Sequence, residues 1–398
     1  MNDWVGPAEL TSQLERHWAR GRILGAMVDG ASIFPLRLRL RGPTRSDLAD
    51  RFDEVRKWIG ELEGSSKSSR GYGYDLEWTE SRHRQLGRNR WPSGAIVPTE
   101  DDALRLIGKR RDAARFREII AATEASFPEL REWLSRYPLI ALECADDWGR
   151  ILAVLTWFRE HPRSGLYLRQ LDIPGVDTKF IEDRRGLIAS LLDRVLPAEA
   201  IDATVAGAGN FEPRYGLRCK PPLVRFRVLD RRLCLHGLSD ITVPVEELAE
   251  LRLGALRAFV TENEINGLAF PELPGSIVIF GMGYRAELLA GVGWLNDIDI
   301  HYWGDIDTHG FGILDRLRGA IPHARSFLMD RATLLAHREL WVSEESGETR
   351  ELNRLTEAER VLYEELRGDR HGIRVRLEQE RVGFAWMQRA LRGLGVAD

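Results

Sequence analysis

Three acidic side chains in the C-terminal half of the chain have the type and spacing of a cation site. Glu262 follows one short apolar run, and Asp305 and Asp307 follow another. Carboxylates brought close together repel and raise one another's pKa values, so a cluster of three usually holds a cation. Oxygen ligands, with no cysteine and no obligatory histidine, favour Mg²⁺ or Mn²⁺ over Zn²⁺. One or two such ions can activate water and neutralise charge as a phosphodiester breaks.

The order of the residues favours this interpretation over a simpler one. Alone, an Asp-x-Asp after a strand is more often a turn or a helix cap. Here a glutamate ends one strand, a glycine turn at 281–283 ends the next, and a third strand runs into Gly-Asp-x-Asp-x-x-Gly at 304–310. Gly304 and Gly310 let the backbone turn tightly around an ion and leave room for a phosphate. We therefore predict a metal site here.

The strands that must position these carboxylates are visible in the hydrophobic pattern. Apolar runs at residues 258–261, 276–280 and 299–303 predict short strands, and a helix is expected from about 310 to 317. Strands separated by helical crossovers indicate a parallel sheet, which binds ligands at the carboxyl ends of its strands. We predict an α/β domain over residues 253–398 with the acidic residues at that end of the sheet.

Two further regions precede this domain, so the fold class is a multidomain mixture of α/β and α+β. Residues 166–252 contain a predicted helix at 178–196 and predicted strands at 223–229 and 233–235, an arrangement that suits a winged-helix (CAP-like) module. Residues 1–165 form a mixed N-terminal arm, interpreted as a partner-docking domain. Its predicted elements are a helix at 7–20, an alternating strand at 33–41, a helix at 47–62, a flexible loop at 63–71 and helices between 101 and 159.

Composition limits the class of protein. The 398 residues carry a net charge of -4, which argues against a general nucleic-acid coat, although local basic surfaces can still hold phosphates. The three cysteines are far apart and fit neither a zinc finger nor a disulfide framework, so a reducing cytoplasm is expected. No apolar run is long enough to span a membrane, and the N-terminus lacks a signal-peptide pattern. We expect a cytoplasmic protein with no membrane partner.

The arrangement around residues 262 and 305–307 resembles the Toprim domain of type II topoisomerases, primases and several nucleases. It is more similar to the A subunit of topoisomerase VI and the meiotic protein Spo-eleven, where a winged-helix module precedes the Toprim domain. The whole chain resembles the JetD family, the nuclease subunits of Wadjet plasmid-defence systems. The segments that carry this resemblance are residues 177–182, 261–263, 303–311 and 376–381.

The resemblance implies a function and partners. Proteins of this family form homodimers in which winged-helix and Toprim units make a channel for double-stranded DNA. They work beside a condensin-like SMC/kleisin ATPase complex (JetABC-like) and cleave closed circular plasmid DNA. This chain contains no GxxxxGK[ST] motif, so nucleotide hydrolysis would need such a partner. Little sequence preference is expected, because contacts to phosphates position DNA without reading its bases.

The resemblance also implies residue roles. Glu262, Asp305 and Asp307 would bind Mg²⁺ or Mn²⁺, with Glu262 also able to act as general base. Glu378 and Glu380 either complete a second cation site or are surface carboxylates. His309 either contacts the scissile phosphate or holds the Asp-x-Asp turn by a hydrogen bond. Lys179 and Arg184 are expected to touch the DNA backbone.

One departure from the topoisomerases decides the expected nucleophile. Those enzymes attack with a tyrosine on the winged-helix unit, but the helix at 178–196 carries Phe180 and no tyrosine. Tyr167 and Tyr215 flank it and are interpreted as structural. We therefore expect metal-activated water as nucleophile. The alternatives are a strand-passing enzyme with a tyrosine nucleophile and a non-catalytic DNA-binding adaptor.

Overall fold

The computed structural model describes residues 4–44, 47–83, 87–205, 207–281 and 283–394. The chain divides into two compact units, Met1–Cys219 and Lys220–Asp398, each with its own hydrophobic core. The predicted boundaries at 165/166 and 252/253 each fall inside one of these units. The division into three domains therefore stays a prediction.

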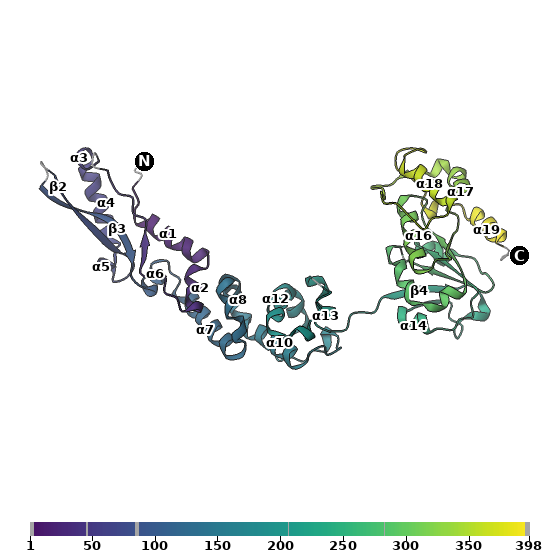
Figure 1. Cartoon of the computed structure of the whole chain (residues 1–398), viewed down its shortest axis with the longest axis horizontal. Coiled ribbons are helices and arrows are strands. Elements are labelled where there is room, and N and C mark those ends of the chain that lie inside the picture. The colour runs from purple at the N-terminus through teal and green to yellow at the C-terminus, as the bar shows by residue number, and fades with distance from the viewer. Residues whose placement is uncertain (1–3, 45–46, 84–86, 206, 282, 395–398) are drawn as a thin grey trace. The chain divides into compact units, whose positions relative to one another are not determined.

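The N-terminal unit begins with two helices, contains a small antiparallel sheet with further helices beside it, and continues as a series of helices (Figure 1). The sheet has the order β1-β3-β2, with β1 at Leu36–Leu38, β2 at Asp75–His83 and β3 at Gly87–Val97. The helices are α1 (Pro7–Ala19), α2 (Arg22–Asp29), α3 (Asp47–Asp50), α4 (Phe52–Gly64), α5 (Lys67–Arg70), α6 (Glu100–Leu106), α7 (Arg110–Ser126), α8 (Arg131–Arg136), α9 (Pro138–Glu143), α10 (Trp148–Glu160), α11 (Thr178–Asp183), α12 (Arg185–Val195) and α13 (Phe211–Arg214).

Most predicted helices of this unit are confirmed, but its strands differ from expectation. The alternating strand expected over 33–41 is paired only at Leu36–Leu38. Beyond it, the side chain of Gln13 bonds both the N–H and the carbonyl of Arg39 at 2.8 Å, so these backbone groups take no part in a sheet. The loop expected at 63–71 contains the short helix α5, and the long β2–β3 hairpin was not predicted.

The C-terminal unit is built on a six-stranded sheet with the order β5-β4-β7-β6-β8-β9. Strands β6 (Arg257–Thr261), β7 (Ser276–Phe280) and β8 (Asp299–Trp303) are parallel neighbours, which confirms the largely parallel sheet. Each has a nearly continuous apolar run because both faces are covered. The other elements are β4 (Leu223–Val228), β5 (Asp240–Pro244), α14 (Val245–Glu250), α15 (Glu264–Ala269), α16 (Thr308–Ala320), β9 (Arg325–Ser326), α17 (Arg331–Ala336), β10 (Val342–Ser343), α18 (Glu357–Arg367), β11 (Val375–Arg376) and α19 (Phe384–Gly393).

The hairpin expected for a winged-helix module is placed differently. The strand predicted at 233–235 is wrong: Arg231–Leu233 is a 3-10 turn, capped by the Asp230 carboxylate, which accepts from the N–H of Arg232. The strand that pairs with β4 is β5. On its other edge β4 pairs antiparallel with β7, so the hairpin extends the C-terminal sheet. The expected helix at 178–196, observed as α11 and α12, belongs to the N-terminal unit.

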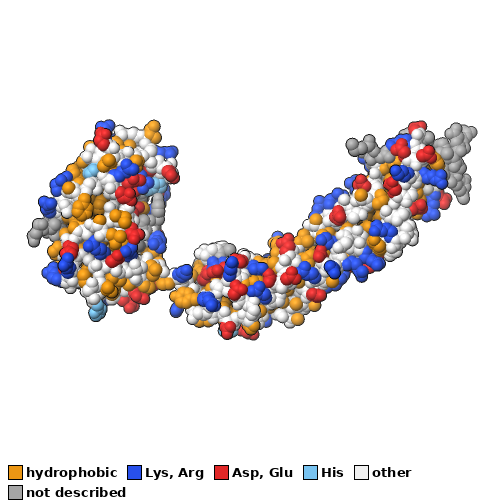
Figure 2. All heavy atoms as spheres, turned by 180° about the vertical axis from the view of Figure 1, so that it is seen from behind, with side chains coloured by type: hydrophobic (Ala, Val, Ile, Leu, Met, Phe, Trp, Pro, Cys, Tyr) orange, Lys and Arg blue, Asp and Glu red, His pale blue; other side chains and the backbone are white. Residues whose placement is uncertain are grey.

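Surface charge is mixed rather than segregated. On the face drawn in Figure 2, Lys and Arg side chains alternate with Asp and Glu over both units. Within the described residues, no helix is long and apolar enough to cross a membrane.

A buried ion pair ties α16 to α18. Arg318 donates to both carboxylate oxygens of Glu359, at 2.5 and 3.0 Å, and both side chains are only 7% exposed. The same guanidinium also donates to the carbonyls of Ala324 and Arg354. Burial by itself would raise the pKa of Glu359, but the hydrogen bonds from Arg318 and its other neighbours outweigh burial and lower it to about 2.

This pair predicts an acid-sensitive contribution to stability. Since the folded pKa of Glu359 lies below its ordinary 4.5, the contribution is complete above pH 4.5 and is lost as the pH falls toward about 2. The pKa shift corresponds to roughly 3 kcal/mol. Unfolding of wild type and Glu359→Gln should be followed by circular dichroism between pH 7 and 2. We expect the stability gap between them to close over this range; a gap independent of pH would contradict the assignment.

Candidate functional site

The predicted acidic residues meet at the carboxyl ends of β6 and β8. Thr261 and Trp303 are opposite each other in the parallel register, so Glu262 and Gly304 follow side by side. The hydroxyl of Tyr302 donates to the Glu262 carboxylate. A side chain at Gly304 would place its Cβ 2.8 Å from Glu262 Oε1, so only glycine leaves this carboxylate room.

Asp305 and Asp307 lie on the turn between β8 and α16. Asp307 is the N-cap of α16 and accepts from the N–H of Gly310 at 2.7 Å. A Cβ at Gly310 would lie 2.1 Å from the Asp305 carbonyl oxygen, so this glycine permits the close approach of helix and turn. The Asp-x-Asp segment is therefore both a helix cap and part of an acidic cluster.

Burial and the repulsion of neighbouring carboxylates raise the pKa values of Glu262 and Asp307. Burial raises the pKa of Glu262 to about 7; the bond from Tyr302 opposes this shift, while Asp305 and Asp307 add to it. Burial likewise raises the pKa of Asp307 to about 6, with Asp305 and Glu344 contributing through their negative charge. Strongly perturbed acidic groups of this kind cluster at functional sites. A cation would offset both causes.

Residues 376–379, near the C-terminus, pack against the turn that carries Asp305 and Asp307. Ile306 and Leu377 exchange backbone hydrogen bonds of 2.9 and 3.1 Å, which sets residues 376–379 against the Asp-x-Asp turn. Arg376 pairs with Asp305 and lies 3.3 Å from the Asp307 carboxylate. Within the described part of the chain, no three His, Cys, Asp or Glu side chains are grouped to hold a metal ion. The donor chemistry fits a hard cation, but the side chains as placed do not, since Arg376 occupies the space.

Gln379 is the most heavily bonded residue of the tail and was not predicted to have a role. Its N–H donates to Asp305 Oδ1 at 2.9 Å, and its side-chain amide donates to the Trp303 carbonyl at 2.8 Å. Its side-chain oxygen accepts from Thr261 at 2.5 Å. Gln379 is 2% exposed and joins the ends of β6 and β8 to the tail. It positions Asp305 without being a charged group itself.

The two glutamates on either side of Gln379 face other partners. Glu378 accepts from Arg381 at 2.8 Å, with Arg376 at 3.9 Å. Glu380 is exposed and accepts from the amide of Asn263, next to Glu262. Both carboxylates therefore lie around the acidic cluster, and a second cation site there stays a prediction.

His309 and Glu344 complete the surroundings of the turn. His309 Nε2 donates to the Ser346 carbonyl at 2.7 Å, which holds the 344–348 segment against the start of α16. Glu344 is 5% exposed; one oxygen accepts from Thr308 at 2.9 Å, and Oε2 is buried without a hydrogen-bond partner among the described residues. Glu344 could not be predicted from the sequence, because no strand or motif links it to residue 307.

The residues predicted to touch DNA belong to the N-terminal unit. Lys179 is exposed on α11. Arg184 pairs with Asp147 and lies 4.4 Å from the ring of Phe180, so its charge is partly committed to its own unit. Tyr215 is 1% exposed and its hydroxyl donates to Asp193 at 2.7 Å. The structural interpretation of Tyr215 is confirmed, whereas Tyr167 is half-buried.

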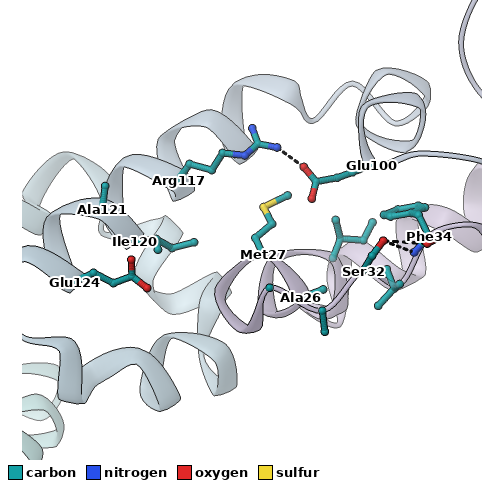
Figure 3. Close-up of a pocket in the computed structure, with 13 residues that line it drawn as sticks. Ala26, Met27, Ser32, Phe34, Glu100, Arg117, Ile120, Ala121 and Glu124 are labelled. Atoms are coloured by element: carbon teal, nitrogen blue, oxygen red, sulfur yellow. Dashed lines mark hydrogen bonds and ion pairs between the residues drawn. The ribbon is translucent and has the colours of Figure 1, made fainter.

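A hollow in the N-terminal unit is a second candidate for a functional site, besides the acidic cluster. It has a volume of about 420 Å³ and lies between α2 and α7 (Figure 3). Met27, Phe34 and Ile120 supply apolar surface. Its charged groups are already paired, Arg117 with Glu100 and Glu124 with Arg131. The hollow therefore offers little chemistry, and the acidic cluster is the better candidate.

Family models match nearly the whole chain. Residues 7–193 match a family described as an uncharacterized protein conserved in bacteria, N-terminal (DUF3322). Residues 216–391 match the C-terminal part of the Wadjet protein JetD. The chain belongs to the JetD family. The JetD match contains the entire site from Glu262 to Gln379, and membership makes the chain a subunit of a multi-subunit Wadjet defence system. Comparison with curated proteins gives no match.

Proposed function

We propose that this JetD-family protein is a divalent-metal-dependent DNA endonuclease that cleaves closed circular plasmid DNA. The observation that carries the proposal is the meeting of Glu262, Asp305 and Asp307 at the carboxyl ends of two adjacent parallel strands. Bound Mg²⁺ or Mn²⁺ supplies activated water and charge neutralisation at the phosphodiester. Glu262, buried at the end of β6 beside Asp305 and Asp307, is the carboxylate assigned to accept a proton from that water.

The finer architecture belongs to the same proposal. Residues 253–398, with the parallel strands β6, β7 and β8, serve as a Toprim domain, and residues 166–252 supply a winged-helix surface with Lys179 and Arg184 toward DNA. The protein acts as a homodimer in the cytoplasm, beside a condensin-like SMC/kleisin ATPase complex. Support comes from the largely parallel sheet and from the Wadjet family match.

Hydrolysis is favoured over a covalent protein–DNA link. Tyr215 is buried, and its hydroxyl is engaged by Asp193 and the Ala189 carbonyl. Burial raises its pKa further above the ordinary value, which makes it a poor nucleophile. A tyrosine-dependent strand passer therefore has less support than an enzyme that uses water.

The test is incubation of supercoiled plasmid with Mg²⁺ or Mn²⁺ and the purified protein, alone and with its partner complex. We expect nicked or linear products and no protein–DNA adduct after a denaturing quench. Relaxation without breaks would indicate strand passage. Unchanged DNA with both metals and all partners would leave a non-catalytic adaptor.

Two glycines on α16, Gly310 and Gly312, allow a test of how closely this helix packs against the turn at Asp305. Gly310→Ala should reduce cleavage about 100-fold, since its Cβ would push the Asp305 backbone aside and a displacement near 1 Å can cost that much. Gly312→Ala, two residues along the same helix, meets nothing closer than 3.6 Å and should leave cleavage unchanged. Plasmid cleavage rates measure both; equal loss in the two variants would show a general helix effect instead.

A further inference from the structure

The guanidinium of Arg376 sits among the carboxylates that the proposed function assigns to a metal ion. Its Nε is 3.1 Å from Asp305 Oδ2, 3.3 Å from Asp307 Oδ2 and 3.9 Å from Glu378 Oε1. A second nitrogen of the same group also contacts Asp305. One cationic side chain thus contacts or neighbours three carboxylates.

Backbone hydrogen bonds position Arg376 beside the Asp-x-Asp turn. Val375–Arg376 is the short strand β11, paired antiparallel with β10, and the next residue, Leu377, is bonded to Ile306. Arg376 is therefore fixed at its Cα beside the Asp-x-Asp turn, while its side chain remains 35% exposed. Because the Arg376 side chain is long and partly exposed, it can change its rotamer and leave the carboxylates without disturbing the fold.

A divalent cation and this guanidinium compete for the same oxygens. Mg²⁺ binds carboxylate oxygens at about 2.0–2.1 Å in near-octahedral geometry. Asp305 Oδ2 already accepts two hydrogen bonds from Arg376, and the positive charges of a cation and the guanidinium would repel.

We propose that Arg376 is an internal counter-ion that holds Asp305 and Asp307 in the metal-free protein and must leave them for a divalent cation to bind. The inference rests on the proposed function. Its consequence is that free protein binds metal more weakly than its carboxylates allow, since only the fraction with Arg376 displaced is competent. A phosphate that pairs with the released guanidinium favours that fraction, so DNA and metal strengthen each other's binding.

The test measures Mn²⁺ binding to the full-length protein without DNA, by isothermal titration calorimetry. Arg376→Gln should bind Mn²⁺ at least about fivefold tighter than wild type, the lower end of common coupling between two sites. Arg381→Gln is the matched control, because Arg381 pairs with Glu378 at 2.8 Å and, within the described part of the chain, pairs with neither aspartate. Its Mn²⁺ affinity should equal that of wild type.

The outcomes separate the inference from the function. Equal or weaker Mn²⁺ binding by folded Arg376→Gln, with wild type binding, overturns the counter-ion role and leaves the metal site intact. No Mn²⁺ binding by any folded variant overturns the proposed metal dependence itself. If Arg376→Gln does not fold, as judged by its melting curve, Arg376→Lys carries the test. Its single ammonium cannot span both aspartates, so an intermediate gain in affinity is expected, and none would overturn the inference.

Discussion

Asp305→Asn is expected to reduce the cleavage of closed circular plasmid by at least about 100-fold. Residues that merely orient a metal ligand already contribute about 10- to 100-fold, so loss of a ligand's charge should exceed that range. The substitution keeps the size of the side chain, and its one amide oxygen can still accept from the N–H of Gln379, while the bonds from Arg376 are lost with the charge. The measurement is the rate of supercoiled plasmid loss with the partner complex and Mg²⁺ or Mn²⁺.

Asp299→Asn is the control for this experiment. Asp299 begins the same strand, β8, but lies at its opposite end, where it is 53% exposed and 3.7 Å from Arg257. Full activity is expected there. If Asp305→Asn cleaved plasmid as fast as wild type, the acidic cluster would not be the catalytic site.

Glu359→Ala is expected to produce the largest loss of stability. It leaves the Arg318 guanidinium buried at 7% exposure with its charge uncompensated, and breaking a buried pair in this way costs about 3–5 kcal/mol. The cost should appear as a lower melting temperature for the C-terminal unit, followed by calorimetry. The N-terminal unit, with its separate core, should melt as in wild type.

Glu357→Ala tests whether burial is the cause. Glu357 lies on the same helix and pairs with Arg360, but its side chain is 75% exposed. Exposed pairs contribute about 0–1 kcal/mol, so this variant should melt close to wild type. A comparable drop in both variants would mean that the helix end, rather than the buried charge, is responsible.

The sequence was most informative where local pattern and burial agree. Strands β7 and β8 have the predicted bounds because each is a compact apolar run closed by glycine. Two sequence features indicate the position of Asp307: it can cap a helix, here α16, and it belongs to the Asp-x-Asp pattern. Strand β5 was missed because the apolar segment 233–235 looked equally extended, whereas its first residue ends the 3-10 turn Arg231–Leu233 that Asp230 caps.

The rest of the site depends on contacts that no local pattern encodes. Glu344 acts on Asp307 from 37 positions away on a segment without a motif, and Tyr302 looks like an ordinary strand residue until Glu262 is placed beside it. The charged residues Glu378 and Glu380 were the predicted ligands in segment 376–381, but the residue that faces inward is the uncharged Gln379. Which member of such a run is buried depends on the bridge between Ile306 and Leu377, which is a tertiary contact.

The hydrogen bonds that Gln379 makes at the ends of β6 and β8 have a consequence for the chain during its synthesis. Asp305 receives the N–H of a residue 74 positions later, and Arg376 arrives only three residues before that. At about 5–20 residues per second, the ribosome takes roughly 4–15 s to supply them after Asp305 is made. During that time residues 376–379 cannot yet bond to the turn that carries Asp305. A polypeptide that stops before residue 376 therefore carries the carboxylates of the acidic cluster without the residues that order them.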